Sequence, residues 1–239
     1  MKGSYLPPSV WEEISVRKLL AASRRGIPTK TQLELLKPAR RTADGDVRVF
    51  AAGDASLVAR PCVSVIGTRK VSDDGAARAK RLSRELVACG VVIVSGLAEG
   101  VDTEAMSSTI QHGGKTIGVI GTPLDKAYPA KNKRLQEEIY QEHLLISQFE
   151  FGARVFPSNF PARNRLMALL SDATVVIEAS DTSGTLHQAA ECVRLGRWLF
   201  IAKSVVADPT IEWPSRFLGY EKCRQLERTE DIMSAVYPS

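Results

Sequence analysis

Between residues 151 and 171 the chain carries arginines and aromatic rings but no acidic residue. The side chains there that could do chemistry are Arg154, Arg163, Arg165, Phe156 and Phe160. A guanidinium binds phosphate through paired hydrogen bonds, and an exposed ring beside it can stack on a nucleobase. The segment therefore predicts a single-stranded nucleic acid as ligand. The structural alternative is that the two rings belong to the core and the arginines pair with surface carboxylates.

A second group of anion-binding features follows the apolar run 62–67. Gly67 opens a turn that contains Arg69 and Lys70 and leads into a helix expected over residues 74–89. The amino end of a helix offers unpaired N–H groups and the positive end of a dipole, so this turn predicts a phosphate site. It does not match the dinucleotide-binding pattern G-x-G-x-x-G, because Arg69 stands where the second glycine is required.

Two further turns, rich in glycine and hydroxyl groups, also lead from an apolar run into a helix. Ser95 and Gly96 begin the first, with Asp102 expected to cap the helix behind it, and residues 180–188 form the second. Together with the turn at Gly67, they predict a cleft lined by hydroxyls, backbone amides and cations.

The same turns do not predict an enzyme, and we expect no catalytic residue. His187 follows Ser183 by one helical turn, but no serine has an evident base and orienting acid beside it. Lys115 follows two glycines, yet the order helix–turn–strand there differs from the strand–loop–helix order of a P-loop. The four cysteines and three histidines lack metal-ligand spacing, so we expect neither a metal nor a cofactor.

Charge is unevenly distributed along the 239 residues, which carry a net charge of +5. Residues 1–41 hold nine lysines and arginines against three glutamates, so the rest of the chain is close to neutral. A basic terminal segment favours a polyanionic partner, although a solvated helix face explains it equally well. No apolar run reaches the roughly 20 residues that cross a bilayer, and residues 1–8 contain no signal core. We therefore expect a cytoplasmic protein without membrane contact.

Apolar runs and amphipathic stretches alternate regularly from residue 62 onward. Strands are predicted over residues 62–67, 91–95, 115–120, 144–147, 173–178 and 198–202. Helices are predicted near residues 74–89, 102–112, 131–142, 161–171 and 185–195. Several strands are apolar on both faces, as in a parallel sheet covered by helices on both sides. The pattern predicts an α/β fold with a doubly wound, mostly parallel sheet, and a ligand at the carboxyl ends of its strands.

Three regions are expected along the chain. Residues 1–45 form a small, basic and helical N-terminal segment, residues 46–203 form the core, and residues 204–239 form a short C-terminal extension. Within the first region the apolar spacing predicts a helix over residues 10–22 and a short one over residues 31–36.

Five motifs occur in a fixed order along the core. They are Gly67-Thr68-Arg69; Ser95-Gly96-Leu97-Ala98 with Asp102; Gly113-Gly114-Lys115-Thr116; Gly121-Thr122 with Tyr128-Pro129; and Asn159-Phe160-Pro161 with Arg163-Asn164-Arg165. In these motifs the chain resembles the DprA/Smf family of DNA-processing proteins over about residues 47–202. The resemblance implies an extended Rossmann-like fold that binds single-stranded DNA. It also implies a homodimer that helps to load the recombinase RecA on incoming strands during natural transformation, without an enzymatic activity.

Carried over by position, the resemblance implies a set of DNA-binding residues. Four cations would hold phosphates, the ring of Phe160 would stack near a base, and the turn at Ser95 and Gly96 would supply backbone donors. The four cations are Arg69, Lys115, Arg163 and Arg165. The full predicted site is Gly67, Arg69, Lys70, Ser95, Gly96, Lys115, Asn159, Phe160, Arg163, Asn164 and Arg165.

The chain departs from the family pattern at three places. Pro123 replaces a usual glycine, residues 181–190 differ from the usual run, and residues 202–204 replace Val-Pro-Gly after the last strand. Residues 203–239 are too short for the winged helix that many members carry, so we expect none. The dimer and RecA surfaces of the family lie toward this altered end.

Two other functions use the same kind of cleft. A nucleotide phosphoribohydrolase requires Pro-Gly-Gly-x-Gly-Thr followed by a catalytic glutamate, and of this motif only Gly184-Thr185 is present. A nucleotide sensor that binds a small phosphorylated signal needs turns similar to those of a DNA-binding protein. Release of free base from a nucleoside monophosphate would indicate the phosphoribohydrolase. Thermal stabilisation by a mononucleotide, but not by an oligonucleotide, would indicate the nucleotide sensor.

Overall fold

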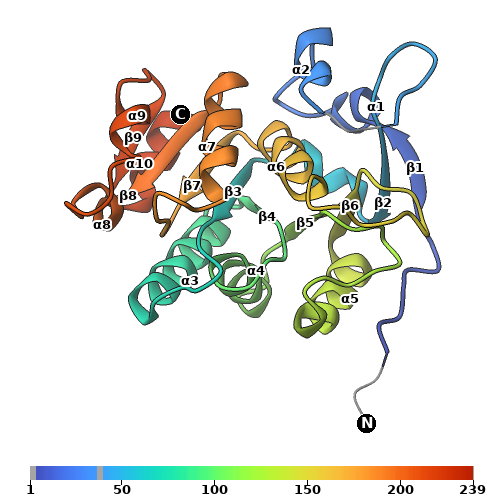
Figure 1. The fold of residues 1–239 in the computed structure, drawn as a ribbon, viewed down its shortest axis with the longest axis horizontal. Helices are drawn as coiled ribbons and strands as arrows, with labels where there is room; N and C mark the ends of the chain where they lie inside the picture. The colour runs from blue at the N-terminus through green and yellow to red at the C-terminus, as the bar shows by residue number, and fades with distance from the viewer. Residues whose placement is uncertain (1–3, 37–39, 239) are drawn as a thin grey trace.

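The computed structural model describes residues 4–36 and 40–238, in which nine strands form one sheet (Figure 1). Along the chain these are β1 (Glu12–Ser15), β2 (Arg48–Gly53), β3 (Cys62–Ile66), β4 (Val92–Ser95), β5 (Thr116–Ile120), β6 (Leu144–Ser147), β7 (Ala173–Val176), β8 (Trp198–Ala202) and β9 (Cys223–Leu226). Their order in the sheet is β1-β2-β6-β5-β4-β3-β7-β8-β9. The pairs of β2 with β1 and β6 are antiparallel and the other pairs are parallel, which confirms the predicted doubly wound sheet.

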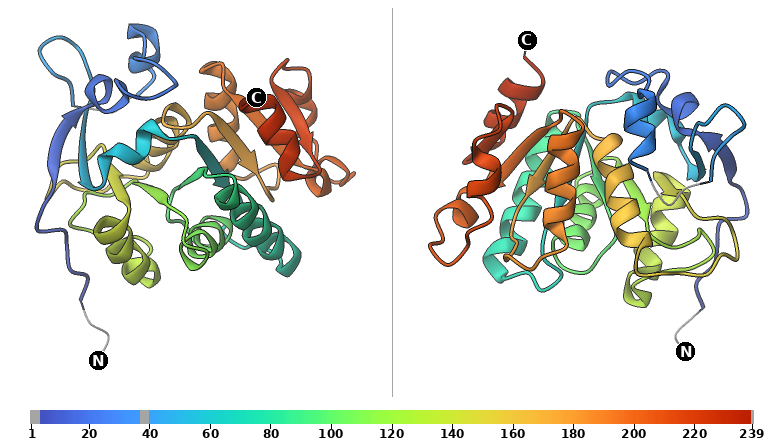
Figure 2. Two further views of the ribbon diagram at one scale, coloured as in Figure 1. Left: turned by 180° about the vertical axis from the view of Figure 1, so that it is seen from behind. Right: turned by 45° about the horizontal axis from the view of Figure 1, so that its top comes forward.

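Helices cover both faces of the sheet, as the two-sided apolar strands predict (Figures 1 and 2). On one face lie α3 (Asp73–Ala88), α4 (Val101–Gln111) and α5 (Lys133–Glu142), and on the other α6 (Asn159–Leu169) and α7 (Thr185–Arg194). The shorter elements are α1 (Val16–Leu20), α2 (Lys30–Glu34), α8 (Lys203–Val206), α9 (Ser215–Leu218), α10 (Thr229–Val236) and the 3-10 turns η1 (Ala55–Ala59) and η2 (Ala130–Asn132). None of the helices in residues 4–36 and 40–238 is both long and apolar enough to cross a membrane.

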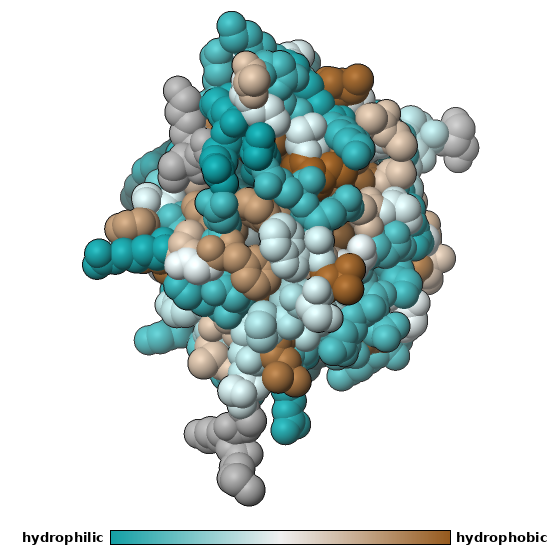
Figure 3. Space-filling model, turned by 90° about the vertical axis from the view of Figure 1, so that its right-hand side faces the viewer, coloured by the Kyte–Doolittle hydropathy of each residue, from teal (hydrophilic) through white to brown (hydrophobic). Residues whose placement is uncertain are grey.

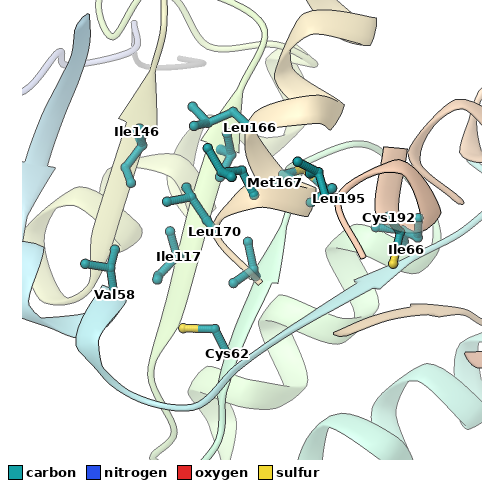
Figure 4. Packing of buried hydrophobic residues seen from close by; sticks show 14 of the residues in the cluster. Val58, Cys62, Ile66, Ile117, Ile146, Leu166, Met167, Leu170, Cys192 and Leu195 are labelled. Carbon is teal, nitrogen blue, oxygen red and sulfur yellow. The ribbon is translucent and has the colours of Figure 1, made fainter. Parts of the chain in front are cut away.

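The core is split by the sheet into layers, because successive strand residues point to opposite faces. In β3, Cys62 and Ile66 pack toward α6 and α7, whereas Val63 and Val65 pack toward α3 and α4. Figure 4 shows the first layer, in which Leu166, Met167 and Leu170 of the α6 region lie over the sheet. This apolar side of α6 orients the helix, and with it the motif residues at its amino end.

The strand order reverses at β3, which lies between β4 and β7. From β3 the chain proceeds through β4 and β5 toward β6, and it then returns to β7 on the other side. Loops that leave neighbouring strands in opposite directions open a crevice at such a switch point. The carboxyl ends of β3, β4 and β7 therefore form the expected place for a ligand.

The predicted helix over residues 10–22 is wrong in its first half. Residues 12–15 form β1, which pairs with β2 through partners such as Ile14 and Val49, and α1 begins only at Val16. Pairing satisfies the backbone of the edge strand and buries Ile14, and this tertiary contact outweighs the helical spacing of the apolar residues. The short second helix is confirmed as α2, with Thr29 as its cap.

The N-terminal and C-terminal regions each add a strand to the sheet, β1 at one edge and β9 at the other. Figure 3 shows the β1 side of the molecule, where hydrophobic groups lie in small patches among hydrophilic ones. Large exposed apolar side chains of the N-terminal region are Leu6, Val10, Trp11 and Ile27. Lys2 and Lys37, two of the nine cations in residues 1–41, lie outside the described residues.

Candidate nucleic-acid interface

Two adjoining cavities lie at the carboxyl ends of the central strands, and we call them together the cleft. The β3–β7 cavity has a volume of about 390 Å³ and lies between the loops after β3 and β7 and the start of α6. The β4–β5 cavity, of about 250 Å³, lies between the loops after β4 and β5. Arg69, Phe160 and Arg163 line both cavities, so the two lie side by side. This is the position predicted from the alternation of strands and helices.

Three side chains from different segments lie in a row inside the cleft. The guanidinium carbon of Arg69 lies 5.9 Å from the centre of the Phe160 ring, and the Tyr128 ring centre lies 5.3 Å from that ring. Arg69 and Lys70 are exposed, and no carboxylate of the described residues pairs with either of them. An exposed cation beside accessible rings is the arrangement that binds a phosphate and a base together.

Arg163 lies beneath the cleft and its side chain is committed to the protein. Only 6% of the residue is exposed, and its guanidinium donates to the carbonyl oxygens of Gly96 and Val119. Burial lowers the pKa of Arg163, while the nearby carboxylate of Asp102 acts in the opposite direction. The structure therefore gives Arg163 a supporting contact to two strand ends, whereas Arg69 faces the cavity.

The loop after β4 is held in a strained shape by three polar side chains. Leu97 has a positive φ of 57°, which is unfavourable for a branched side chain. The carboxylate of Asp102 accepts from the amides of Gly96 and Ala98, at 3.0 and 3.4 Å, and Asn132 donates to the carbonyl oxygen of Leu97 at 2.9 Å. With the contact from Arg163 to Gly96, three side chains hold this loop in the structure without a ligand.

Asp102 does not cap its helix as predicted, because the cap position of α4 is Gly100. The carboxylate instead turns back to the loop, where burial raises its pKa while Arg163 and the two amides favour the charged form. The amide of Gly96 is consequently used inside the protein and is not a free donor for a ligand. A Cβ on Gly96 would clash with the Arg163 guanidinium, so a larger residue there would displace that side chain from its two carbonyl partners.

The amino end of α3, predicted as a phosphate site, is occupied by Glu178 from the loop after β7. The Glu178 carboxylate accepts from the amide and the hydroxyl of Ser72, at 3.1 and 2.6 Å, and the Ser72 hydroxyl in turn caps the Gly75 amide at 3.0 Å. A Cβ on Gly75 would lie 2.1 Å from that carboxylate. An acidic side chain of the chain itself therefore interacts with the helix dipole.

The remaining predicted residues divide between the cleft and other places. Gly67 and Asn164 line the β3–β7 cavity, and Lys70 and Gly96 line the β4–β5 cavity. Ser95 and Asn159 are buried, and the Ser95 hydroxyl donates to the carbonyl oxygen of Val65 at 2.7 Å.

Two of the predicted phosphate ligands are placed away from the cleft. Lys115 lies at the amino end of β5, opposite the cleft, and its Nζ donates to the Glu142 carbonyl oxygen at 2.9 Å. Arg165 lies on the outer side of α6 and pairs with Glu191 of α7 at 3.3 Å. The motif pattern does not separate Arg165 from Arg69, because it does not encode which face of a helix a residue occupies, whereas Lys115 begins the predicted strand 115–120.

Three lining residues are absent from the predicted set of site residues, although the predicted turn 180–188 and the Tyr128-Pro129 motif contain them. Tyr128 is 48% exposed between the cleft and the start of α5, and the single aromatic in its loop was the available signal. His187 and Gln188, at the start of α7, line the β3–β7 cavity. Gln188 is 1% exposed and its amide nitrogen has no hydrogen-bond partner among the described residues, so a donor is available at the wall of the cavity.

The cleft thus combines cations, rings and an unpartnered amide at the switch point of the sheet. A comparison with known families shows which family the chain belongs to. A model of the family DNA recombination-mediator protein A matches residues 32–237. The chain belongs to this family. That membership confirms the resemblance drawn from the five motifs.

Relatives and solved structures agree with the assignment. Over 165 residues the chain is 41% identical to DNA processing protein DprA of Streptococcus pneumoniae. This alignment covers 69% of this chain and 58% of the relative. Over 140 residues it is 43% identical to Protein Smf of Synechocystis, covering 59% of this chain and 35% of the relative. The matched part therefore spans between about a third and three fifths of these relatives.

The fold is similar to two solved structures of DNA processing protein A. The X-ray structure of the Streptococcus pneumoniae protein aligns with a TM-score of 0.75 and 32% identity, over 95% of this chain and 74% of the other. The Helicobacter pylori protein, described with a single-stranded DNA binding mode, aligns with a TM-score of 0.73 and 24% identity, over 94% of each chain. The second likeness concerns the fold alone.

Proposed function

We propose that this protein binds single-stranded DNA in the cleft and acts as a recombination mediator. The row of Arg69, Phe160 and Tyr128 carries the proposal, because it offers a phosphate contact and ring surfaces in one cleft. Membership of the recombination-mediator family supports it, and the Helicobacter pylori protein, which has the same fold, is described with a single-stranded DNA binding mode. In this proposal Arg69, Lys70 and Phe160 contact the strand, and Arg163 positions the loop behind them.

The proposal is tested by fluorescence anisotropy with a labelled oligothymidine and a duplex of the same length, in parent protein and Arg69→Gln. Parent protein should prefer the single strand, because the rings can reach only unpaired bases. Removing one phosphate contact should weaken binding about fivefold and reduce the salt slope by about 0.7. Arg84→Gln, an exposed arginine of α3 outside the cleft, is the matched control and should bind as the parent does.

Equal losses of affinity in Arg69→Gln and Arg84→Gln would contradict the proposal, since binding would then depend on the net charge of the protein and not on the cleft. If only mononucleotides stabilised the protein against heat, the nucleotide sensor would replace the DNA-binding function. The phosphoribohydrolase is the weaker alternative, because His187 and Gln188 stand where its catalytic carboxylate is required.

We further propose that the protein works in the cytoplasm as a homodimer that assists RecA and performs no catalysis itself. The family supports these features, while β9 and α10 form the end at which the sequence departs from the usual pattern. Sedimentation velocity measures the dimer, and RecA strand exchange on protein-coated single strands measures the assistance. A monomer at all concentrations, or unchanged RecA activity, would remove the corresponding part of the proposal.

A further inference from the structure

The cleft does not end at Tyr128, because the same side chain forms the wall of a third cavity. This α5 cavity, with a volume of about 1200 Å³, is lined by the loop after β5, the start of α5, Tyr5 and Val155. Tyr128 also lines the β4–β5 cavity. The three cavities thus lie next to one another along the carboxyl edge of the sheet, from the loop after β7 to the loop after β6.

The α5 cavity is lined by an excess of cations. Its charged side chains are Lys126, Lys131, Lys133, Arg134 and Asp125. The first turn of α5 contains no acidic residue, so these cations lie against an unfavourable dipole that an anion would offset. Lys131 pairs with Glu99 at 2.8 Å and Lys126 donates to the Ala153 carbonyl oxygen at 2.9 Å. Arg134 is exposed, and no carboxylate of the described residues pairs with it.

Fixed walls surround this cavity on the side of the N-terminal region. The Tyr5 hydroxyl donates to the Leu124 carbonyl oxygen at 2.8 Å and accepts from the Gln136 amide at the same distance. The cavity therefore repeats the chemistry of the cleft, with cations and the rings of Tyr5 and Tyr128 on its wall.

We infer that a single strand bound in the cleft continues past Tyr128 into the α5 cavity, where Arg134 contacts the phosphates of the next nucleotides. The inference rests on the proposed function and extends it, because it gives the strand a direction across the molecule. Charge complementarity and the shared Tyr128 wall argue for this occupant over another. In this arrangement Tyr128 separates an inner part of the strand in the cleft from an outer part beside α5.

Two labelled oligothymidines test the inference, one of about 4 and one of about 12 nucleotides, within the range bound by single-strand modules. Arg134→Gln should bind the short strand as the parent does, and should bind the long strand about fivefold more weakly, with the salt slope reduced by about 0.7. Arg84→Gln is again the matched control, and thermal unfolding of each variant verifies that the fold is retained.

The outcomes separate this inference from the proposed function. If parent protein bound neither strand, the proposed function would fail. If parent protein bound both strands and Arg69→Gln weakened both, while Arg134→Gln matched Arg84→Gln on the long strand, only the extension into the α5 cavity would be overturned. An equal loss by Arg134→Gln on both strands would also overturn it, since the contact would then belong to the cleft.

Discussion

At the residue scale, Arg69 and Arg163 both belong to the five motifs but have different roles, because Arg69 is exposed and Arg163 is buried. Arg69 projects into the cavity beside Phe160, whereas Arg163 donates to two carbonyl oxygens under the loop after β4. The distinction is hidden in the sequence, since the partners of Arg163 lie 67 and 44 residues away along the chain. A loss of DNA binding would therefore have different causes at the two positions.

Arg163→Met should destabilise the fold, because it leaves the buried Asp102 carboxylate and two carbonyl oxygens without their cation. We expect the free energy of unfolding to fall by about 3 kcal/mol, measured by urea denaturation. Arg69→Gln is the contrasting variant, which should lose affinity while its urea midpoint stays within error of the parent. Unchanged stability of Arg163→Met, with weakened DNA binding, would show that its guanidinium faces the ligand.

At the element scale, the loop after β4 depends on one carboxylate. Asp102→Asn keeps the shape of the side chain but replaces a charged acceptor of the Gly96 and Ala98 amides. We expect a loss of about 1–2 kcal/mol in stability and faster hydrogen exchange at these two amides. Asp44→Asn, at an exposed turn, is the control. Unaltered exchange at Gly96 and Ala98 would mean that Asn132 and Arg163 suffice to hold the loop.

The junction of α5 and β6 should respond to acid. Burial and the nearby Lys115 lower the pKa of His143 below its ordinary value of 6.5, with Glu142 acting against them. The unfolded chain then binds the proton more readily than the fold, so this contribution to stability is present above pH 6.5 and is lost as the pH falls through the folded pKa. His143→Gln should therefore weaken the decrease in melting temperature between pH 7 and 5, as followed by circular dichroism. An identical decrease in parent and variant would contradict this assignment.

The elements themselves could be predicted to different degrees. The strands β3, β4 and β7 are apolar on both faces, and the helices between them are amphipathic, so the alternation alone identifies a doubly wound sheet. The strand β1 could not be predicted, because its only support is pairing with β2, some 35 residues later in the chain. The candidate site was predicted where motif residues follow a strand or begin a helix on the cleft side, as at Arg69 and Phe160. Arg165 and the occupied end of α3 depend on packing that no local pattern contains, whereas Lys115 begins the predicted strand 115–120 and therefore lies at its amino end.

At the scale of the whole molecule, Asp172 joins three distant parts of the chain. Its carboxylate accepts from the guanidinium of Arg25 at 3.1 Å, from the amide of Cys62 at 2.9 Å and from the hydroxyl of Tyr237 at 2.9 Å. The Arg25 side chain is fully buried. Desolvation and the neighbouring carboxylate raise the pKa of Tyr237, so its hydroxyl keeps the proton that it donates. The N-terminal region, the start of β3 and the end following α10 are thereby tied at a single point.

Asp172→Asn should loosen all three attachments together, because it leaves the buried Arg25 without a countercharge. We expect a loss of about 3–5 kcal/mol in the free energy of unfolding, measured in urea. Tyr237→Phe removes one neutral donor from the same carboxylate and should lose only about 1 kcal/mol. If the two variants lost similar amounts of free energy of unfolding, the ion pair between Arg25 and Asp172 would not be the main contribution of this carboxylate to stability.

The strained loop at Leu97 also has a consequence for kinetics. Because Asp102, Asn132 and Arg163 hold that loop before DNA arrives, binding need not wait for a rearrangement there. In stopped-flow experiments the observed association rate should rise linearly with oligonucleotide concentration, without the plateau of a conformational step, and should slow markedly with added salt. Differences in affinity between strands would then arise from how long each strand stays bound, and the protein would capture any single strand at nearly the same speed.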